Sequence, residues 1–157
     1  MGTVVSIHVA NANGGDLIDL REATLVAGQG IQGDRNFGKG ENDPAKELSL
    51  VAAEQVEHFN RVTGLNIEPQ ETRRNVVTRG IALADLVGQR FVIGEVVAEA
   101  IDLSEPCKLL GGRLETDEVS SAEVIKAFTG RAGVRARIVR GGVIRPGDEI
   151  AAQIDCS

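Results

Sequence analysis

The chain of 157 residues carries 17 basic and 23 acidic side chains, a formal net charge of −6, and is 42% hydrophobic but only 3% aromatic. A chain of this length can bury the core of one domain, which must be aliphatic because Trp and Tyr are absent. The normal apolar content excludes a disordered chain, and an acidic chain with few aromatic rings is poorly suited to nucleic-acid binding, which needs a basic face.

Targeting and redox signals point to the cytoplasm. Residues 1–6 lack the basic segment and apolar run of a secretory signal, and no stretch approaches the roughly 18–20 consecutive apolar residues of a membrane helix. Two cysteines, Cys107 and Cys156, cannot build a disulfide framework. We therefore expect a cytoplasmic protein that docks on neither membranes nor nucleic acid.

Short β-branched and aliphatic segments alternate with glycine turns along the chain, which contains 19 Gly. They predict strands at residues 3–9, 22–26, 47–51, 75–78, 90–93, 96–101, 134–139 and 149–154.

A first helix is predicted at about residues 52–63. Val56, Phe59 and Val62 recur at helical spacing and form one apolar stripe. Gly64 suits the C-terminal cap of this helix, because a glycine adopts the left-handed conformation without strain.

A capping box of Ser120 and Glu123 opens a second predicted helix, which ends near residue 128. Seven or eight short strands, two helices and no regular strand–helix alternation favour a β-rich α+β domain over residues 1–157. We expect a closed or distorted β-barrel with the helices packed outside.

Cys107 is the residue with the strongest intrinsic reactivity. It follows Glu105-Pro106 on an expected loop, and its thiolate could act as nucleophile, persulfide carrier or soft metal ligand. Lys108 and Arg113 would lower its pKa, whereas Glu105 would oppose that. A small buried hydrophobic residue is the alternative interpretation, and Cys156 is interpreted as incidental.

A glycine-rich loop spans residues 28–40 and contains a Gly-x-Gly-x-x-Gly pattern at residues 28–33. A dinucleotide site needs a helix that opens at those glycines, and the residues that follow are not helical. We therefore reject the nucleotide fingerprint. An Arg-bearing loop beside an anion site and an ordinary long turn both stay open.

Two arginines, Arg73 and Arg74, stand just before a predicted strand. Guanidinium groups form bidentate hydrogen bonds with phosphate and carboxylate oxygens, so an anion site is one interpretation. A surface ion pair with Glu68 or Glu71 is the other.

A further arginine pair and the histidines carry weaker signals. Arg135 and Arg137 share one face of a late strand, where they form either a cationic wall for an anionic ligand or a solvated face. His8 and His58 are interpreted as structural or exposed, and we find no Ser-His-Asp order and no His-rich zinc centre in the sequence.

An ordered set of short motifs nevertheless resembles the MOSC domain, the C-terminal domain of molybdenum-cofactor sulfurase, over nearly the whole chain. The motifs are Gly33-Asp34-Arg35, Thr72-Arg73-Arg74-Asn75-Val76-Val77, Gly80-Ile81, Leu86-x-Gly88-x-x-Phe91-x-Ile93-Gly94, Pro106-Cys107, Gly130-Arg131 and Gly141-Gly142-x-Ile144-x-x-Gly147-Asp148-x-Ile150.

The resemblance implies a β-barrel and a role for the Pro-Cys cysteine, which ligates molybdenum or carries sulfur as a persulfide. Cys107 stands at that position. In relatives that reduce N-hydroxylated compounds, an Arg and an Asn before a strand lie near the pterin, and Arg73 and Asn75 match them. Arg35 is a further match within the glycine-rich loop.

The sequence also departs from longer relatives. It lacks their N-terminal β-barrel segment and is too short for a pyridoxal-phosphate cysteine desulfurase, so pyridoxal phosphate is expected only through a separate desulfurase partner. It also lacks the cysteine set of an iron–sulfur cluster. Reductase activity would therefore require an external electron donor.

Three hypotheses follow. The first is a reductase that binds molybdenum cofactor, with Cys107 on the metal and Arg73, Asn75 and Arg35 on the pterin and its phosphate. The second is a sulfur carrier that forms a persulfide on Cys107 for metal–sulfur acceptors. The third is a non-enzymatic module that binds molybdopterin.

Overall fold

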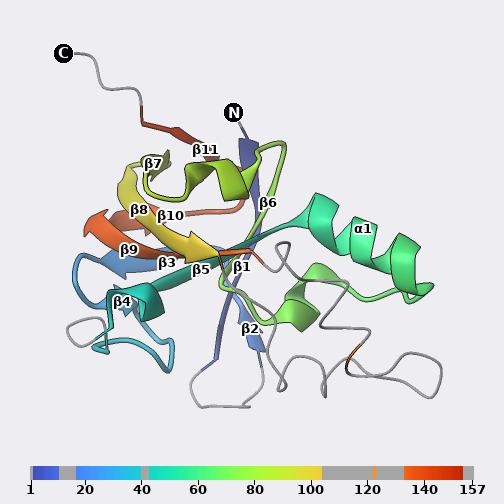
Figure 1. Cartoon of the computed structure of the whole chain (residues 1–157). Coiled ribbons are helices and arrows are strands. Elements are labelled where there is room, and N and C mark those ends of the chain that lie inside the picture. Colours follow the sequence, from blue (N-terminus) through green and yellow to red (C-terminus); the bar gives the residue numbers. More distant parts are fainter. Residues whose placement is uncertain (1, 11–16, 40–42, 104–121, 123–132, 154–157) are drawn as a thin grey trace.

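The computed structural model describes residues 2–10, 17–39, 43–103, 122 and 133–153. This part of the chain contains eleven strands, one α-helix and three short 3₁₀ helices (Figure 1). The strands are β1 (Gly2–Ala10), β2 (Leu17–Asp19), β3 (Ala23–Val26), β4 (Gly30–Ile31), β5 (Leu48–Ala52), β6 (Val76–Arg79), β7 (Arg90–Ile93), β8 (Val96–Leu103), β9 (Val134–Arg140), β10 (Gly142–Ile144) and β11 (Glu149–Ala152). The helices are α1 (Ala53–Thr63), η1 (Pro44–Lys46), η2 (Pro69–Thr72) and η3 (Leu83–Leu86).

Seven of the strands close into a barrel. Their order is β11-β7-β8-β9-β5-β6-β1, and β11 pairs again with β1. All of these pairs are antiparallel except β5 with β6, whose parallel pairing is made possible by the crossover through α1. β2 extends the sheet beyond β1, and β10, β3 and β4 form a second small sheet. The predicted β-barrel is therefore confirmed.

The barrel interior is aliphatic, as the composition predicts. Alternate residues of each strand face inward, and Phe91 is the large ring among them. Alanines opposite one another on β8 and β9, Ala100 and Ala136, leave space for such larger side chains. Leu25 and Ile31 of the small sheet belong to the same cluster, so one core serves both sheets.

α1 packs against the outside of the barrel (Figure 1). Ala53 and Val56 contact Val51 and Val77, which project outward from β5 and β6. The helix ends at Gly64, whose φ of 77° is the left-handed cap that the sequence predicts. The first predicted helix is confirmed, whereas the second, at residues 120–128, lies outside the described residues apart from Ala122.

An irregularity in β1 decides which residues face outward. Its register against β6 shifts between Val4 and Ser6, which is the signature of a β-bulge. Val4 and Ile7 both belong to the interior core although three positions separate them. The bulge therefore turns Ser6 and His8 to the outer face, whereas strict alternation from Val4 would have placed them inside.

Candidate functional site

Asn75 joins three strands at the point where β6 begins. Its Oδ1 accepts hydrogen bonds from the backbone N–H and hydroxyl of Ser49 on β5, at 3.1 and 3.0 Å. Its Nδ2 donates to the His8 carbonyl on β1 at 3.1 Å, and its own carbonyl accepts from the His8 N–H at 2.7 Å. With 8% of its surface exposed, Asn75 is a buried amide that fixes the chain just after Arg73.

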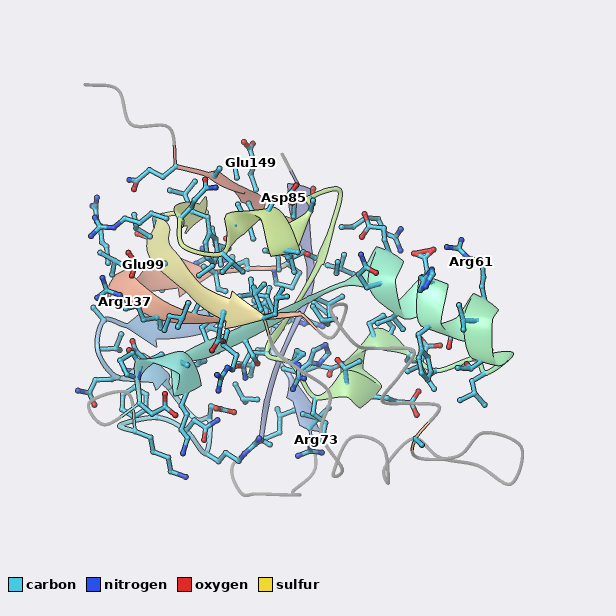
Figure 2. The ribbon with its side chains drawn as sticks, in the orientation of Figure 1. Arg61, Arg73, Asp85, Glu99, Arg137 and Glu149 are labelled. Carbon is cyan, nitrogen blue, oxygen red and sulfur yellow. The ribbon has the colours of Figure 1, made fainter. Side chains whose placement is uncertain are left out.

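Arg73 lies in this corner with a left-handed backbone, φ 61°. It is the one non-glycine residue with positive φ in the described part of the chain, and this conformation costs a residue with a side chain roughly 1–2 kcal/mol. Strain of this kind persists where the surrounding structure holds the backbone in place, and Asn75, two residues later, is fixed by its hydrogen bonds to β5 and β1. Figure 2 shows Arg73 on the same side of the molecule as β2.

The Gly33-Asp34-Arg35 turn is anchored to the same end of β1. Buried Asp34 accepts hydrogen bonds from the Ala10 N–H at 3.1 Å and the Asn36 N–H at 3.2 Å, and the Arg35 N–H donates to the Ala10 carbonyl at 2.6 Å. Within the described residues, no ion pair or side-chain hydrogen bond is made by Arg35. Because residues 8 and 10 are about 7 Å apart along a strand, the structure brings the backbones of the two predicted corners together.

The glycine-rich loop is a sequence of turns with the short strand β4, and no helix opens at residues 28–33. The expectation that the residues after this pattern are not helical is therefore confirmed. A buried carboxylate, Glu47, holds this loop: its Oε1 accepts from the Gly28 N–H and the Ile138 N–H, each at 3.1 Å.

Arg135 and Arg137 do not form a cationic wall. Arg135 donates to both carboxylate oxygens of Asp102, at 2.8 and 2.5 Å, and Arg137 donates to Glu99 at 2.9 Å. Each pair joins residues opposite one another on β8 and β9. The Arg137 hydrogen bond lowers the pKa of Glu99, and the Asp102 hydrogen bond raises the pKa of Arg135. The interpretation as a solvated face is the one that the structure supports.

Cys107 and Cys156 lie outside the described residues, as do Lys108 and Arg113. Their predicted roles, including Cys107 as metal ligand or persulfide carrier, stay predictions. The described residue nearest before Cys107 is Leu103, at the end of β8.

One constellation was missed. Ser6 Oγ lies 2.8 Å from His8 Nε2, and His8 Nδ1 lies 2.7 Å from Asp19 Oδ1, so the three side chains form a Ser–His–Asp chain that the sequence order did not suggest. His8 was predicted to be structural or exposed, and the structure shows it to be buried. The statement that the sequence contains no Ser-His-Asp order was wrong. The available signal was Ser-x-His on a strand, where both side chains share a face.

Comparison with protein-family models shows the family of the chain. The MOSC domain model matches residues 14–151. The chain belongs to the MOSC domain family. No curated protein sequence matches it closely enough to count as a relative.

Solved structures agree on the fold of this MOSC domain. It is similar to the YuaD protein of Bacillus subtilis, with a TM-score of 0.83 at 19% identity over 96% of this chain and 94% of the other. YiiM from Geobacillus stearothermophilus gives 0.74 at 17% identity, over 98% and 76%. YiiM from Escherichia coli gives 0.69 at 18% identity, over 99% and 71%.

Within the described residues of this MOSC domain, no cluster of His, Cys, Asp and Glu could hold a metal ion, and no helix is long and apolar enough to cross a membrane.

Proposed function

We propose that this MOSC protein binds molybdenum cofactor and reduces N-hydroxylated or related compounds. Cys107 would ligate the metal, and Arg35 and Arg73 would hold the anionic pterin phosphate. The observation that carries the proposal is the convergence of the Gly33–Arg35 turn and the Arg73–Asn75 corner on one end of β1.

The residues present fit such a group in their chemistry. Guanidinium groups bind phosphate oxygens with two parallel hydrogen bonds. Arg35 lies in a turn that is hydrogen bonded to β1, and Arg73 comes two residues before Asn75, which is also hydrogen bonded to β1. A thiolate is a soft ligand of the kind that transition metals accept in proteins. Family membership supports the pairing of these residues with a molybdenum cofactor.

Asn75 would act mainly as a positioning residue in this proposal. Its Oδ1 accepts two hydrogen bonds and one Nδ2 hydrogen is used by His8, so contact with a cofactor would come from the remaining Nδ2 hydrogen. The hydrogen bonds of Asn75 would hold the nearby backbone of Arg73 in one conformation before an anion binds. A backbone ordered in advance lowers the entropic cost of binding.

When bound, the cofactor would supply a molybdenum centre for removal of an oxygen atom, as when an N-hydroxyl compound becomes an amine. The chain itself would orient the pterin through Arg73 and Arg35 and hold the metal through the Cys107 thiolate. Electrons would come from an external donor protein, because two cysteines cannot bind an iron–sulfur cluster.

The test is metal analysis and pterin fluorescence on protein purified from a host that makes molybdenum cofactor. We expect near-stoichiometric molybdenum and pterin in the wild type, loss of molybdenum in Cys107→Ala, and reduced pterin in Arg35→Ala. Arg145→Ala is the matched control, because Arg145 is an exposed arginine that pairs with Glu22 and is not among the proposed cofactor-binding residues. The molybdenum and pterin content of this variant should equal that of the wild type.

Molybdenum retained in full by Cys107→Ala would contradict the proposed ligand. If the wild type holds neither component, the reductase proposal fails and a sulfur carrier becomes the function to test. Incubation with a cysteine desulfurase and cysteine should then add the mass of one sulfur atom at Cys107, since persulfide transfer needs only a reactive thiol.

A further inference from the structure

The Ser6–His8–Asp19 chain has the connectivity of a nucleophilic triad. Asp19 accepts at His8 Nδ1 over 2.7 Å, and Ser6 Oγ meets the opposite ring nitrogen, Nε2, over 2.8 Å. Both distances lie in the range that a general base and its nucleophile require. The bulge in β1 produces this arrangement, because it puts Ser6 and His8 on the outer face, with Asp19 directly opposite His8 on β2.

The direction of the hydrogen bonds follows from the carboxylate. An ionised carboxylate can only accept, so the Nδ1 of a neutral His8 must carry the proton and donate to Asp19. Nε2 then has a lone pair and accepts from the Ser6 hydroxyl. This is the tautomer in which the imidazole can remove the serine proton. The position of the ring is fixed by the surrounding protein, because His8 is only 2% exposed.

A cavity adjoins the chain of hydrogen bonds. It has a volume of about 510 Å³, and all three residues of the triad contribute to its lining. Val56 and Ile67 supply apolar walls, from α1 and from the segment before η2. A volume of this size accommodates a small organic molecule, which usually needs a largely apolar site with a few placed polar groups.

Hydrogen-bond donors are available on the same wall. Arg79 lines the same cavity, two residues after Val77, which is the cross-strand partner of Ser6. Because of the bulge, Arg79 itself lies opposite Thr3. One of its terminal nitrogens pairs with Glu57 at 2.6 Å. The guanidinium has five N–H donors, so others stay available to a developing oxyanion.

We propose that Ser6 is the nucleophile of an acyl-transfer site that hydrolyses small carboxylic esters, with His8 as general base and Asp19 as the positioning residue. The site is formed from β1, β2 and the cavity under α1. It includes neither Cys107 nor a metal, so it is a second activity that does not rest on the reductase proposal.

The reaction balances with water as the only co-reactant. Ser6 Oγ attacks the ester carbonyl carbon while its proton passes to His8 Nε2, and the C–O bond to the leaving alcohol breaks as that alcohol takes the proton. Water then attacks the acyl-serine ester and gives its proton to His8. The bond to Ser6 breaks, the proton returns to Oγ, and a carboxylic acid leaves.

The experiment uses a fluorophosphonate reagent and p-nitrophenyl acetate on the cofactor-free protein in the Cys107→Ala background, which removes that thiol from the assay. We expect labelling that peptide mapping places on Ser6 and ester hydrolysis that Ser6→Ala abolishes. Thr3→Ala is the matched control, because Thr3 is an exposed hydroxyl residue on the same strand outside the cavity. Its labelling should equal that of the parent protein.

Asp19→Asn separates a catalytic role from a structural one. Asp19 is 79% exposed, so the variant should fold, yet it should lose ester hydrolysis by about tenfold or more because the imidazole tautomer is no longer fixed. Thermal unfolding of each variant checks the fold. A parent protein that neither labels nor hydrolyses the ester overturns the proposal, as does labelling that persists in a folded Ser6→Ala protein.

Discussion

Two regions of the molecule carry a pair of arginines, and the surroundings of the two pairs differ. On β9, Arg135 and Arg137 lie opposite Asp102 and Glu99 of β8, and each guanidinium is neutralised across the strands (Figure 2 shows the Glu99–Arg137 pair). At the end of β1, Arg35 and Arg73 lie in turns whose backbones are fixed by Asp34 and Asn75.

This comparison shows that the register of the sheet decides whether an arginine on a strand forms an ion pair. A strand residue meets whatever its cross-strand neighbour offers, and here that neighbour is a carboxylate. Arg35 and Arg73 lie off the barrel strands, in segments whose backbones are anchored at the end of β1 by hydrogen bonds of Asp34 and Asn75. Two pairs with the same composition therefore form a solvated ladder in one place and a candidate anion site in the other.

The largest expected effect comes from the anchor of the candidate site. Asn75→Ala removes the acceptor of the Ser49 N–H and hydroxyl and the side-chain donor to the His8 carbonyl. The Ser49 hydroxyl keeps only the hydrogen bond that it accepts from the backbone N–H of residue 75. We expect a loss of about 3 kcal/mol of unfolding free energy, because each unsatisfied buried group costs about 1–3 kcal/mol. Urea unfolding with an unchanged m-value measures it. A loss below about 0.5 kcal/mol would show that Asn75 is not the anchor.

The strained residue of the same corner comes next. Arg73→Gly should be more stable than Arg73→Ala by about 1 kcal/mol, because glycine adopts a φ of 61° without the Cβ penalty. Both variants lose the guanidinium, so their pterin content should fall equally. Equal unfolding free energies of the two variants in urea would contradict the left-handed conformation of residue 73. Unequal pterin contents would show that the backbone conformation of residue 73, and not only its guanidinium, affects pterin binding.

The ladder on β8 and β9 should matter less. A double-mutant cycle of Arg137→Ala and Glu99→Ala should give a coupling of about 0.2–1 kcal/mol, the range of exposed ion pairs. Neither single variant should change molybdenum or pterin content. A drop in content would mean that this pair belongs to the binding site, which would remove the contrast between the two regions.

The smallest effect is the pH dependence of that ladder. The Arg137 hydrogen bond lowers the pKa of Glu99 from its ordinary value of 4.5. The folded state thus favours the ionised carboxylate, so this stabilisation is present above pH 4.5 and is lost as the pH falls through the lowered pKa. The difference in unfolding free energy between the wild type and Glu99→Gln should shrink by a few tenths of a kcal/mol over that range. A difference that grows on acidification would contradict the direction of the shift.

Much of the fold could be predicted because local patterns and the tertiary structure agree. The predicted stripe with Gly64 after it specifies α1 within one residue at its start. Val56 and Phe59 of that stripe are buried, whereas Val62 is exposed, so its place in the stripe was wrong. β2, β4 and β10 were not predicted, because strands of two or three residues carry no periodicity, and their pairing partners define them. Arg73 and Asn75 were predicted as cofactor-binding residues from the order of the motifs along the chain, not from any local pattern.

The sequence by itself determined an aliphatic β-barrel, the helix α1 and the family, because residue alternation, helical spacing, glycine turns and motif order can be read along the chain. Only the tertiary structure decided which arginines are neutralised and which polar side chains meet. Ser6 and Asp19 are thirteen positions apart and reach His8 through a bulge and an antiparallel pairing. The one extra residue of a bulge moves the side chains that follow it to the opposite face of the strand. Where that residue is inserted depends on the pairing with the partner strand.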